Sequence, residues 1–407
     1  MIRIAVMGSF DTKGVELGYL RDKLTELGVQ PLTIDIGVGG EPQIPADISA
    51  GSCLELTGTD IGTVRKMGRS EAVQAMTAAA VKTAKKCLTE GRMDGIITMC
   101  GGTGSAVCNA VYDSLPFGFP KVMLSSLPPL MGSAERLSLN DTLFMHSIVD
   151  VAGLNDIMRR QLDYAAASIA AVAQYAANTP MTPTGSERHP RVALTMFGVT
   201  TPCVETVAGI LSKHGYDPYI FHANGDGGFQ MERLMRQGFF DGVIDITLAE
   251  IMPEFFEGAA CYGGPQRLKA AGELNLPRLY VPGALDVANY LDIPASQKYD
   301  RVFHMHTPAL KVLRPNTSDS RKIGAEVGKR ISIGGGSVEV VIPAKGLSQT
   351  DYAGHPCYDA EANDALFQAI RSNLRPGIPV TEVECHINDP AFGQKVAEIF
   401  MSRILPR

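Results

Sequence analysis

Short apolar runs alternate with longer amphipathic stretches along most of the chain, and the same succession occurs twice. An apolar run at residues 2–6 leads into a glycine turn and a helical stretch, and a run at 192–196 does the same. Strands that alternate with amphipathic helices are typical of a parallel sheet covered on both faces. The pattern predicts an α/β protein with two Rossmann-like, doubly wound subdomains related by an internal duplication, followed by a C-terminal αβ extension.

The two halves correspond segment by segment in the same order. Residues 91–97 and 238–244 share the form Gly-x-x-Asp-Gly, and Met145-His146-Ser147 is matched last, with Met305-His306-Thr307. The predicted subdomains cover residues 1–180 and 190–407. The stretch 178–190, rich in Pro, Thr and Ser, is the predicted linker.

The first amphipathic stretch predicts a helix over residues 13–27. Leu17, Leu20, Leu24 and Leu27 recur at three- and four-residue steps and so share one face, and Gly28 suits a left-handed helix stop. Further helices are predicted over 70–91 and 154–177. The loop 41–59, between the first predicted helix and the one over 70–91, has a length that is typical of functional or mobile loops.

Composition narrows the class of protein. A chain of 407 residues is long for one core, and 45% hydrophobic with 20% charged residues is ordinary for a globular protein. A net charge of −6 disfavours binding to nucleic acid or to an anionic membrane. The eight cysteines form no Cys-x-x-Cys pair, and no signal peptide is apparent, so we expect reduced thiols and a cytoplasmic protein.

The glycine turn after the first strand is a candidate phosphate site. Asp11 or Thr12 can cap the helix that follows, and free N–H groups at a helix start attract anions. Lys13 adds a positive charge, and Thr12 can donate a hydrogen bond or face Mg²⁺. The cofactor-binding residues predicted here are Gly8, Asp11, Thr12, Lys13 and Gly14. The alternative is a capped helix start that binds no ligand.

The turn after residues 95–98 is the strongest candidate phosphate cradle. Its glycines let the backbone approach a phosphate, and its hydroxyls can donate hydrogen bonds. The predicted residues are Gly101, Gly102, Thr103, Gly104 and Ser105. The spacing fits neither the dinucleotide fingerprint nor the P-loop. A tight strand-to-helix turn without a ligand is the alternative.

The equivalent edge of the second half is expected to face a second ligand. Its predicted substrate-binding residues are Thr200, Thr201, His222, Gly225, Gly227 and Gly228. Asp226 and Glu250 follow strands at this edge, and together with Lys13 they are the candidate catalytic residues. Glu250 can hold Mg²⁺, bind a diol or act as a general base; it can also be a helix-start glutamate without catalytic role.

The histidines do not predict a metal site. His304 and His306 alternate on one strand and so point to the same face, and His222 and His355 could join them from other loops. No zinc signature accompanies them. We therefore predict no metal site built by the protein, and Mg²⁺ only as the ion that accompanies a bound nucleotide.

Several of these motifs resemble one known family. They are Asp11-Thr12-Lys13-Gly14-x-Glu16, the turn at 101–105, Gly153-Leu154-Asn155, the turn at 198–202, the glycine loop at 221–228, and the segments 282–286 and 352–359. The chain resembles, over nearly its whole length, the ATP-binding-domain family typified by the N-terminal region of the tomato mosaic virus resistance protein. The resemblance implies two Rossmann-like subdomains, ATP binding and a homodimer. The plant protein carries a further TIM-barrel domain, which implies a separate TIM-barrel partner here.

The sequence therefore predicts an ATP- or nucleotide-binding protein that acts as a metabolic enzyme on a small molecule in a cleft between its subdomains. Two alternatives stay open. One is an ATP-independent hydrolase or lyase for a small hydroxy- or keto-acid, with Asp226 and Glu250 as acid and base. The other is a binding module that senses a ligand by closing around it.

Overall fold

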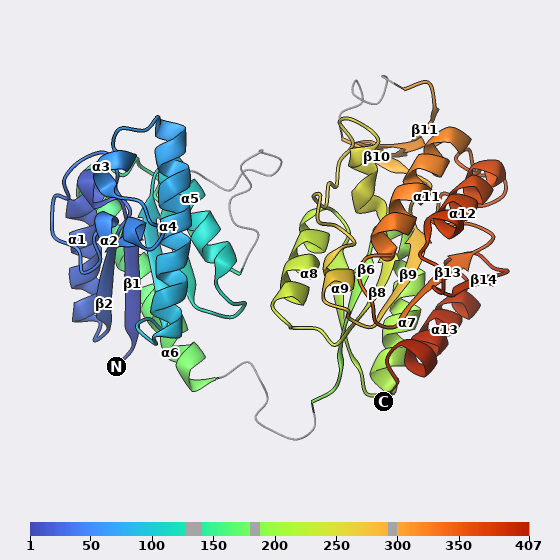
Figure 1. Ribbon diagram of the computed structural model, residues 1–407, viewed down its shortest axis with the longest axis horizontal. Helices are drawn as coiled ribbons and strands as arrows, with labels where there is room; N and C mark the ends of the chain where they lie inside the picture. Colours follow the sequence, from blue (N-terminus) through green and yellow to red (C-terminus); the bar gives the residue numbers. More distant parts are fainter. Residues whose placement is uncertain (127–140, 180–187, 292–298, 407) are drawn as a thin grey trace. The chain divides into compact units, whose positions relative to one another are not determined.

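The computed structural model describes residues 1–126, 141–179, 188–291 and 299–406. The chain divides into two compact units, Met1–Thr184 (unit 1) and Gly185–Arg407 (unit 2) (Figure 1). Most of the predicted linker, residues 180–187, lies outside the described residues.

Unit 1 is built on a parallel five-stranded sheet with the order β2-β1-β3-β4-β5. Its strands are β1 (Arg3–Gly8), β2 (Gln30–Asp35), β3 (Gly95–Cys100), β4 (Lys121–Ser125) and β5 (Leu143–His146). Its helices are α1 (Phe10–Glu26), α2 (Ala50–Glu55), α3 (Ile61–Val64), α4 (Arg69–Thr89), α5 (Gly102–Ser114) and α6 (Asp156–Asn178).

Helices cover both faces of this sheet, as the alternation along β1 requires. Ile4 and Val6 pack with α1 and α6 in one core, whereas Ala5 and Met7 pack with α2, α4 and α5 in the other (Figure 1). Because β2 and β3 lie on opposite sides of β1, the loops after β1 and β3 flank the point where strand order reverses. Ligands of open α/β sheets bind at such points.

Unit 2 repeats this plan in a parallel six-stranded sheet with the order β14-β13-β9-β8-β6-β7. Its strands are β6 (Arg191–Met196), β7 (Asp217–His222), β8 (Gly242–Thr247), β9 (Arg278–Gly283), β13 (Val338–Pro343) and β14 (Val380–Val383). A separate antiparallel sheet contains β10 (Ala288–Tyr290), β11 (Val302–Thr307) and β12 (Leu310–Arg314).

The helices of unit 2 also form two layers. On one face α7 and α13 pack in a common core, and on the other α8 and α9 form one cluster while α11 and α12 form another. The helices are α7 (Thr201–Lys213), α8 (Asp226–Arg236), α9 (Ala270–Glu273), α11 (Thr317–Ile331), α12 (Ala360–Asn373) and α13 (Pro390–Ile399). Short helical turns are η1 (Gly198–Thr200), η2 (Ala249–Glu254) and η3 (Phe400–Ile404).

The predicted fold class is confirmed, including the two parallel Rossmann-like sheets, but two details are wrong. The last match between the halves, Met145-His146-Ser147 with Met305-His306-Thr307, equates β5, a strand of a parallel sheet, with β11, a strand of the small antiparallel sheet. By its place next to β9, β13 is the counterpart of β5. Leu27, expected on the buried face of α1, is 50% exposed because the helix ends at Glu26.

The elements give no candidate for a membrane-spanning helix: among the described residues, none combines the necessary length with sufficient apolar character.

Candidate functional site

A cavity of about 440 Å³ opens at the strand-order reversal of unit 1. Asp11, Thr12 and Gly104 of the predicted site line it, joined by Ser9. Its other lining residues are Ile36, Val38, Gly39, Val64, Arg65, Met67, Arg69, Ala72, Val73, Met76 and Val107. The starts of α1 and α5 therefore reach one cavity, whose volume is within the range of small-molecule sites.

The cap of α1 differs from the prediction. Ser9 is the N-cap residue and makes no side-chain capping bond; instead Asp35, at the end of β2, accepts hydrogen bonds from Phe10 N (3.0 Å) and Gly37 N (2.8 Å). Burial raises the pKa of the Asp35 carboxyl, and these two N–H donors oppose that effect. Asp35 thus fixes the start of α1 and leaves Asp11 and Thr12 for the cavity.

Asp11 has one oxygen bound and one unbound. Its Oδ2 accepts from Gly39 N (2.8 Å) and Gly40 N (3.2 Å), whereas its Oδ1 is buried without a hydrogen-bond partner among the described residues. A Cβ atom on Gly37 would lie 2.6 Å from Asp11 Cγ, so a glycine is needed there. A buried unpaired acceptor is costly, and a ligand hydroxyl or a cation would satisfy it.

Lys13 does not line this cavity. Its Nζ donates to the carbonyl of Val151, and one turn later Glu16 Oε1 accepts from Gly153 N at 2.5 Å. These two contacts fasten α1 to the loop that precedes α6. Gly8 also has a packing role, since a Cβ there would lie 2.8 Å from Leu17 Cδ1.

Gly14 is closely packed too: an added Cβ would lie 2.8 Å from Gln43 Cβ. The glycine holds the loop after β2 against α1, away from the cavity lining. Its role in the structure is therefore packing.

The turn between β3 and α5 contributes backbone to the cavity rather than side-chain hydroxyl groups. Gly101 is the N-cap of α5, Gly102 begins the helix, and Gly104 lines the cavity. Ser105 is buried, and its Oγ contacts Ser125 Oγ (2.8 Å) and donates to the Gly101 carbonyl (3.0 Å). Ser105 thus holds the turn in place, while the side chain of Thr103 lies outside the described residues.

Sequence reasoning missed the wall that α3 and α4 contribute. Arg65 and Arg69 bring two guanidinium groups to the cavity, and Val64, Met67 and Met76 bring apolar surface. Arg65 also donates to Glu41 Oε1 at 2.7 Å. The unusual length of the loop 41–59 was the one signal that pointed to this region, but these residues lie just beyond it.

In unit 2, the two predicted threonines differ in position. Thr200 is buried, and its Oγ1 lies 2.7 Å from Thr247 Oγ1, so it links the ends of β6 and β8. Thr201 begins α7, and its Oγ1 donates to the Phe197 carbonyl at 3.3 Å. His222 is exposed, and its ring stacks on Phe197 with centroids 5.3 Å apart.

The glycine loop after β7 serves close packing. Gly225 has φ of +100°, a backbone conformation that favours glycine. A Cβ on Gly227 would overlap the His222 carbonyl, and one on Gly228 would overlap the Glu250 carboxylate. All three glycines thus let the start of α8 approach its neighbours.

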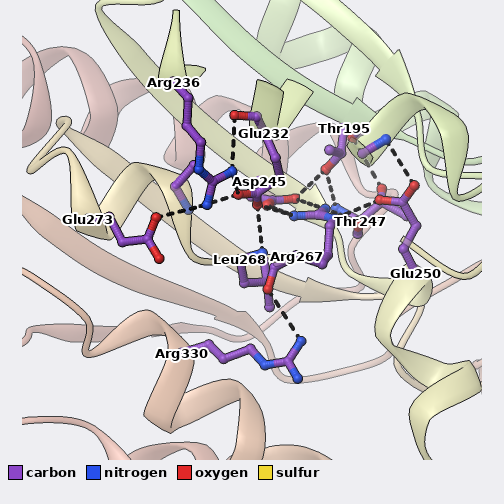
Figure 2. A network of polar contacts seen from close by, with 12 residues as sticks. Thr195, Glu232, Arg236, Asp245, Thr247, Glu250, Arg267, Leu268, Glu273 and Arg330 are labelled. Atoms are coloured by element: carbon purple, nitrogen blue, oxygen red, sulfur yellow. Dashed lines mark hydrogen bonds and ion pairs between the residues drawn. The ribbon is translucent and has the colours of Figure 1, made fainter. Parts of the chain in front are cut away.

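Glu250 is a structural anchor in this arrangement, with no exposed surface. Its Oε1 accepts from Gly225 N (2.7 Å) and Gly228 N (3.0 Å), and its Oε2 accepts from Arg267 Nε (2.7 Å). Figure 2 shows the Glu250 carboxylate beside Arg267, with dashed lines to its hydrogen-bond partners. The geometry does not favour Glu250 as a general base, because both its oxygens are occupied and it is closed to solvent.

Arg267 is the centre of a buried ion network (Figure 2). It donates to Asp245 Oδ2 (2.5 Å) and Oδ1 (2.7 Å) and lies 3.7 Å from Glu232. Glu232 in turn accepts from Leu268 N and Ala270 N. Burial raises the pKa of Glu232 and Arg267 opposes the shift. One fully buried arginine thereby organises three carboxylates.

Asp226 is the first residue of α8 and is half-buried. It shares unit 2 with Glu250, whereas Lys13 belongs to unit 1. Glu250, which lies in η2 after β8, contacts the loop that leads into Asp226, and of the two acids only Asp226 retains exposed surface.

Of the four histidines considered for a metal site, His304 and His355 are in ring contact. The rings of His304 and His355 lie 4.7 Å apart, and His355 also contacts Tyr352. Across the described ranges, no group of three His, Cys, Asp or Glu side chains could hold a metal ion. All eight cysteines are free thiols.

Comparison with known proteins identifies two family models along the chain. The N-terminal domain of the uncharacterised protein family UPF0261 matches residues 2–178, and its C-terminal domain matches residues 189–404. A UPF0261 protein of Mesorhizobium japonicum is 35% identical over 402 residues, which is 98% of both chains. The ToMV resistance protein Tm-1(GCR237) of Solanum lycopersicum is 30% identical over 86% of this chain and 47% of its own length. The predicted resemblance to the tomato protein is thus confirmed.

Solved structures match only weakly. UDP-GlcNAc 2-epimerase from Methanocaldococcus jannaschii aligns over 99% of this chain and 93% of its own, with 10% identity and a TM-score of 0.23. MurG of Acinetobacter baumannii aligns over 98% and 99%, with 11% identity and a TM-score of 0.21. At these scores the matches bear on neither ligand nor reaction.

Proposed function

This chain belongs to the protein family UPF0261, and we propose that it is a nucleotide-binding protein whose unit 1 holds ATP, or a related phosphorylated ligand, in the cavity between α1, α4 and α5. One observation carries the proposal: two helix starts, two arginines and an apolar wall meet in one cavity of suitable volume.

The polar lining residues of the cavity suit phosphates. Backbone N–H groups at the start of a helix carry partial positive charge, and α1 and α5 both begin here. Arg65, which also pairs with Glu41, and Arg69 add positively charged groups, and the planar guanidinium group matches phosphate oxygens in pairs. Thr12, which is exposed, adds a hydroxyl.

The apolar lining residues suit a nucleotide base. They include Val38, Val64, Met67, Val73 and Met76, and ligand sites typically combine such a wall with a few placed polar groups. Methionine adapts to planar rings because its unbranched chain is flexible and its sulfur polarisable.

The cavity is also compatible with Mg²⁺. Asp11 Oδ1 is a buried oxygen without a partner among the described residues, and carboxylate oxygen is a preferred ligand of this ion. Mg²⁺ in nucleotide sites usually takes one or two carboxylates and completes its shell with phosphates and water. When bound, the ion would neutralise phosphate charge beside Asp11.

The test is calorimetric titration of the full chain with ATP, with and without Mg²⁺. We expect Arg65→Met to weaken ATP binding by about tenfold or more, since hydrogen bonds to charged groups contribute about 1.5–3 kcal/mol. Arg21→Met is the matched control, because Arg21 is a partly exposed residue of α1 that pairs with Asp22 outside the cavity lining. Equal thermal stability of both variants without ligand would separate binding from folding.

The proposal is wrong if the wild-type chain does not bind ATP, or if Arg65→Met binds it as well as Arg21→Met does. Lys13→Ala is a second control. We expect it to lower stability through the lost contact with Val151 rather than to remove a phosphate contact.

The wider proposal includes an enzyme, a cytosolic setting, a homodimer and a separate TIM-barrel partner, which rest on composition and on the resemblance. An ATP-independent hydrolase using Asp226 and Glu250 has less support, because Glu250 is sealed in the ion network. The third candidate, a ligand-sensing module, would also bind ATP in the titration, and it differs from an enzyme only in leaving the ligand chemically unchanged.

A further inference from the structure

Unit 2 has an open cavity of its own, of about 740 Å³, at the carboxyl edge of its sheet. Loops that follow β6, β13 and β14 form it. The lining residues are Gly198, Thr201, Pro202, Lys345, Gln349, Tyr352, His386, Asn388 and Asp389. Of the residues predicted for a second ligand, only Thr201 belongs to this set.

Hydrogen bonds between the three loops hold the cavity in shape. The carbonyl of Val199 accepts from Gln349 N (2.9 Å) and from Asn388 Nδ2 (3.0 Å), so one atom after β6 ties the other two loops together. Ser348 Oγ donates to the fully buried Asp286 at 2.7 Å, which anchors the loop after β13 from behind. Such prior order lowers the entropic cost of binding a ligand.

His386 has a structural role in this wall. Its Nδ1 accepts from Asn388 N (3.1 Å), which leaves Nε2 to donate to the Ser348 carbonyl (2.9 Å). Both nitrogens are therefore used within the wall, Nε2 toward the Ser348 carbonyl and Nδ1 toward Asn388 N. His386 shapes the cavity and offers no free nitrogen to a ligand.

The side-chain oxygen of Asn388 accepts no hydrogen bond from the described residues. Its Nδ2 donates to Val199, which fixes the orientation of the amide, because the flipped amide would set oxygen against oxygen. Its Oδ1 is then buried without a partner among the described residues. A ligand hydroxyl can supply that donor, which an oxygen anion alone cannot.

Lys345 supplies a positive charge at the same cavity. Its side chain is 63% exposed, and its nearest carboxylate is Glu384 at 4.0 Å, a weak and solvated pair. Asp389, whose Oδ2 accepts from His386 N at 2.8 Å, adds acceptor capacity for further hydroxyls. Tyr352 and Pro202 give apolar surface against which the carbon chain of a ligand can lie.

From this combination we propose that the unit 2 cavity binds a small hydroxylated carboxylic acid, with Lys345 at the carboxylate and Asn388 Oδ1 at a hydroxyl. A cation, a fixed acceptor and an apolar surface in one cavity match that chemical class better than a plain anion, which would leave Asn388 unsatisfied. The inference goes beyond the nucleotide site and uses no residue of unit 1.

The experiment titrates the full chain with gluconate, threonate and glycerate by ligand-observed NMR. Sorbitol, which has hydroxyls without a carboxylate, and butyrate, which has a carboxylate without hydroxyls, are the chemical controls. We expect saturable binding of at least one of the three acids and weaker binding of both controls. Lys345→Met should weaken binding of the acid by about tenfold or more, as expected for the loss of a hydrogen bond to a charged group.

Lys395→Met is the matched variant. Lys395 lies on α13 close to the cavity in sequence but pairs with Glu398 outside the lining, so acid binding should be unchanged. The proposal is overturned if none of the acids binds up to about 10 mM, if Lys345→Met binds like the wild type, or if butyrate binds as well as the hydroxy acids. ATP titration of Lys345→Met distinguishes the two sites, because failure at one leaves the result at the other intact.

Discussion

At the scale of single residues, Glu250 shows how a carboxylate at a strand end can serve stability. Its two oxygens accept two backbone N–H groups and one guanidinium N–H, all without contact with water. A buried charge of this kind is stable only while its partners are in place. Removing one charge leaves the network around Arg267 unbalanced.

We predict that Glu250→Gln lowers the free energy of unfolding by about 3 kcal/mol, the range for breaking a buried ion pair. The measurement is urea denaturation followed by circular dichroism. Glu273→Gln is the control: Glu273 pairs with Arg236 at 2.8 Å but its side chain is 43% exposed, so the loss should stay below about 1 kcal/mol. Equal losses in the two variants would contradict a structural role for Glu250.

The residues also show where sequence reasoning reaches its limit. Asp11, Thr12 and Gly104 could be placed at a cavity because loop position after a strand fixes them. Lys13 and Ser105 have the right chemistry for phosphate, yet they bind Val151 and Ser125, which lie far away in sequence. Nothing local in the chain reports the direction of such a side chain.

At the scale of elements, the first turn of α8 can form only because its backbone packs directly against the Glu250 carboxylate. Gly228 lies in the first turn of α8, and its N–H donates to Glu250 while its missing Cβ leaves room for that same group. Glu250 cannot retreat, because Arg267 and Gly225 hold it.

We therefore predict that Gly228→Ala destabilises the protein by about 1–3 kcal/mol, as for an overpacked core. Gly209→Ala provides the opposite case: Gly209 lies inside α7, and an added Cβ meets no atom within 4 Å. Since alanine is the better helix former, that change should be neutral or stabilise by up to about 1 kcal/mol. Thermal unfolding of both variants tests the contrast, and a stable Gly228→Ala protein would refute it.

Most elements could be predicted from periodicity alone. The helix expected over 70–91 is α4 (Arg69–Thr89), and the one over 154–177 is α6 (Asp156–Asn178). The predicted correspondence between β5 and β11 is wrong, because a short apolar run has the same sequence pattern whether its strand lies in a parallel sheet or in an antiparallel hairpin. Which strands lie side by side in a sheet is set by the tertiary structure, and a comparison of the two halves of the sequence does not reveal it.

At the scale of the whole molecule, each unit has its own cores on both faces of its own sheet. We predict that residues 1–179 and residues 188–407, expressed separately, each fold. Each should give native-like far-UV circular dichroism and one cooperative urea transition, the behaviour of an independent domain. A fragment that unfolds gradually, without a defined midpoint, would show that it requires the other.

The ion network of unit 2 has an evolutionary consequence. After β3 the chain enters a glycine turn beside an open cavity, whereas after β8 Glu250 and Arg267 fill the space beside the loop after β7. If both halves descend from one duplicated ancestor, the corresponding edge is now open in one copy and closed by a buried ion network in the other. The second copy has its open cavity elsewhere, among the loops after β6, β13 and β14, so the two halves differ in which part of the sheet edge is accessible to a ligand.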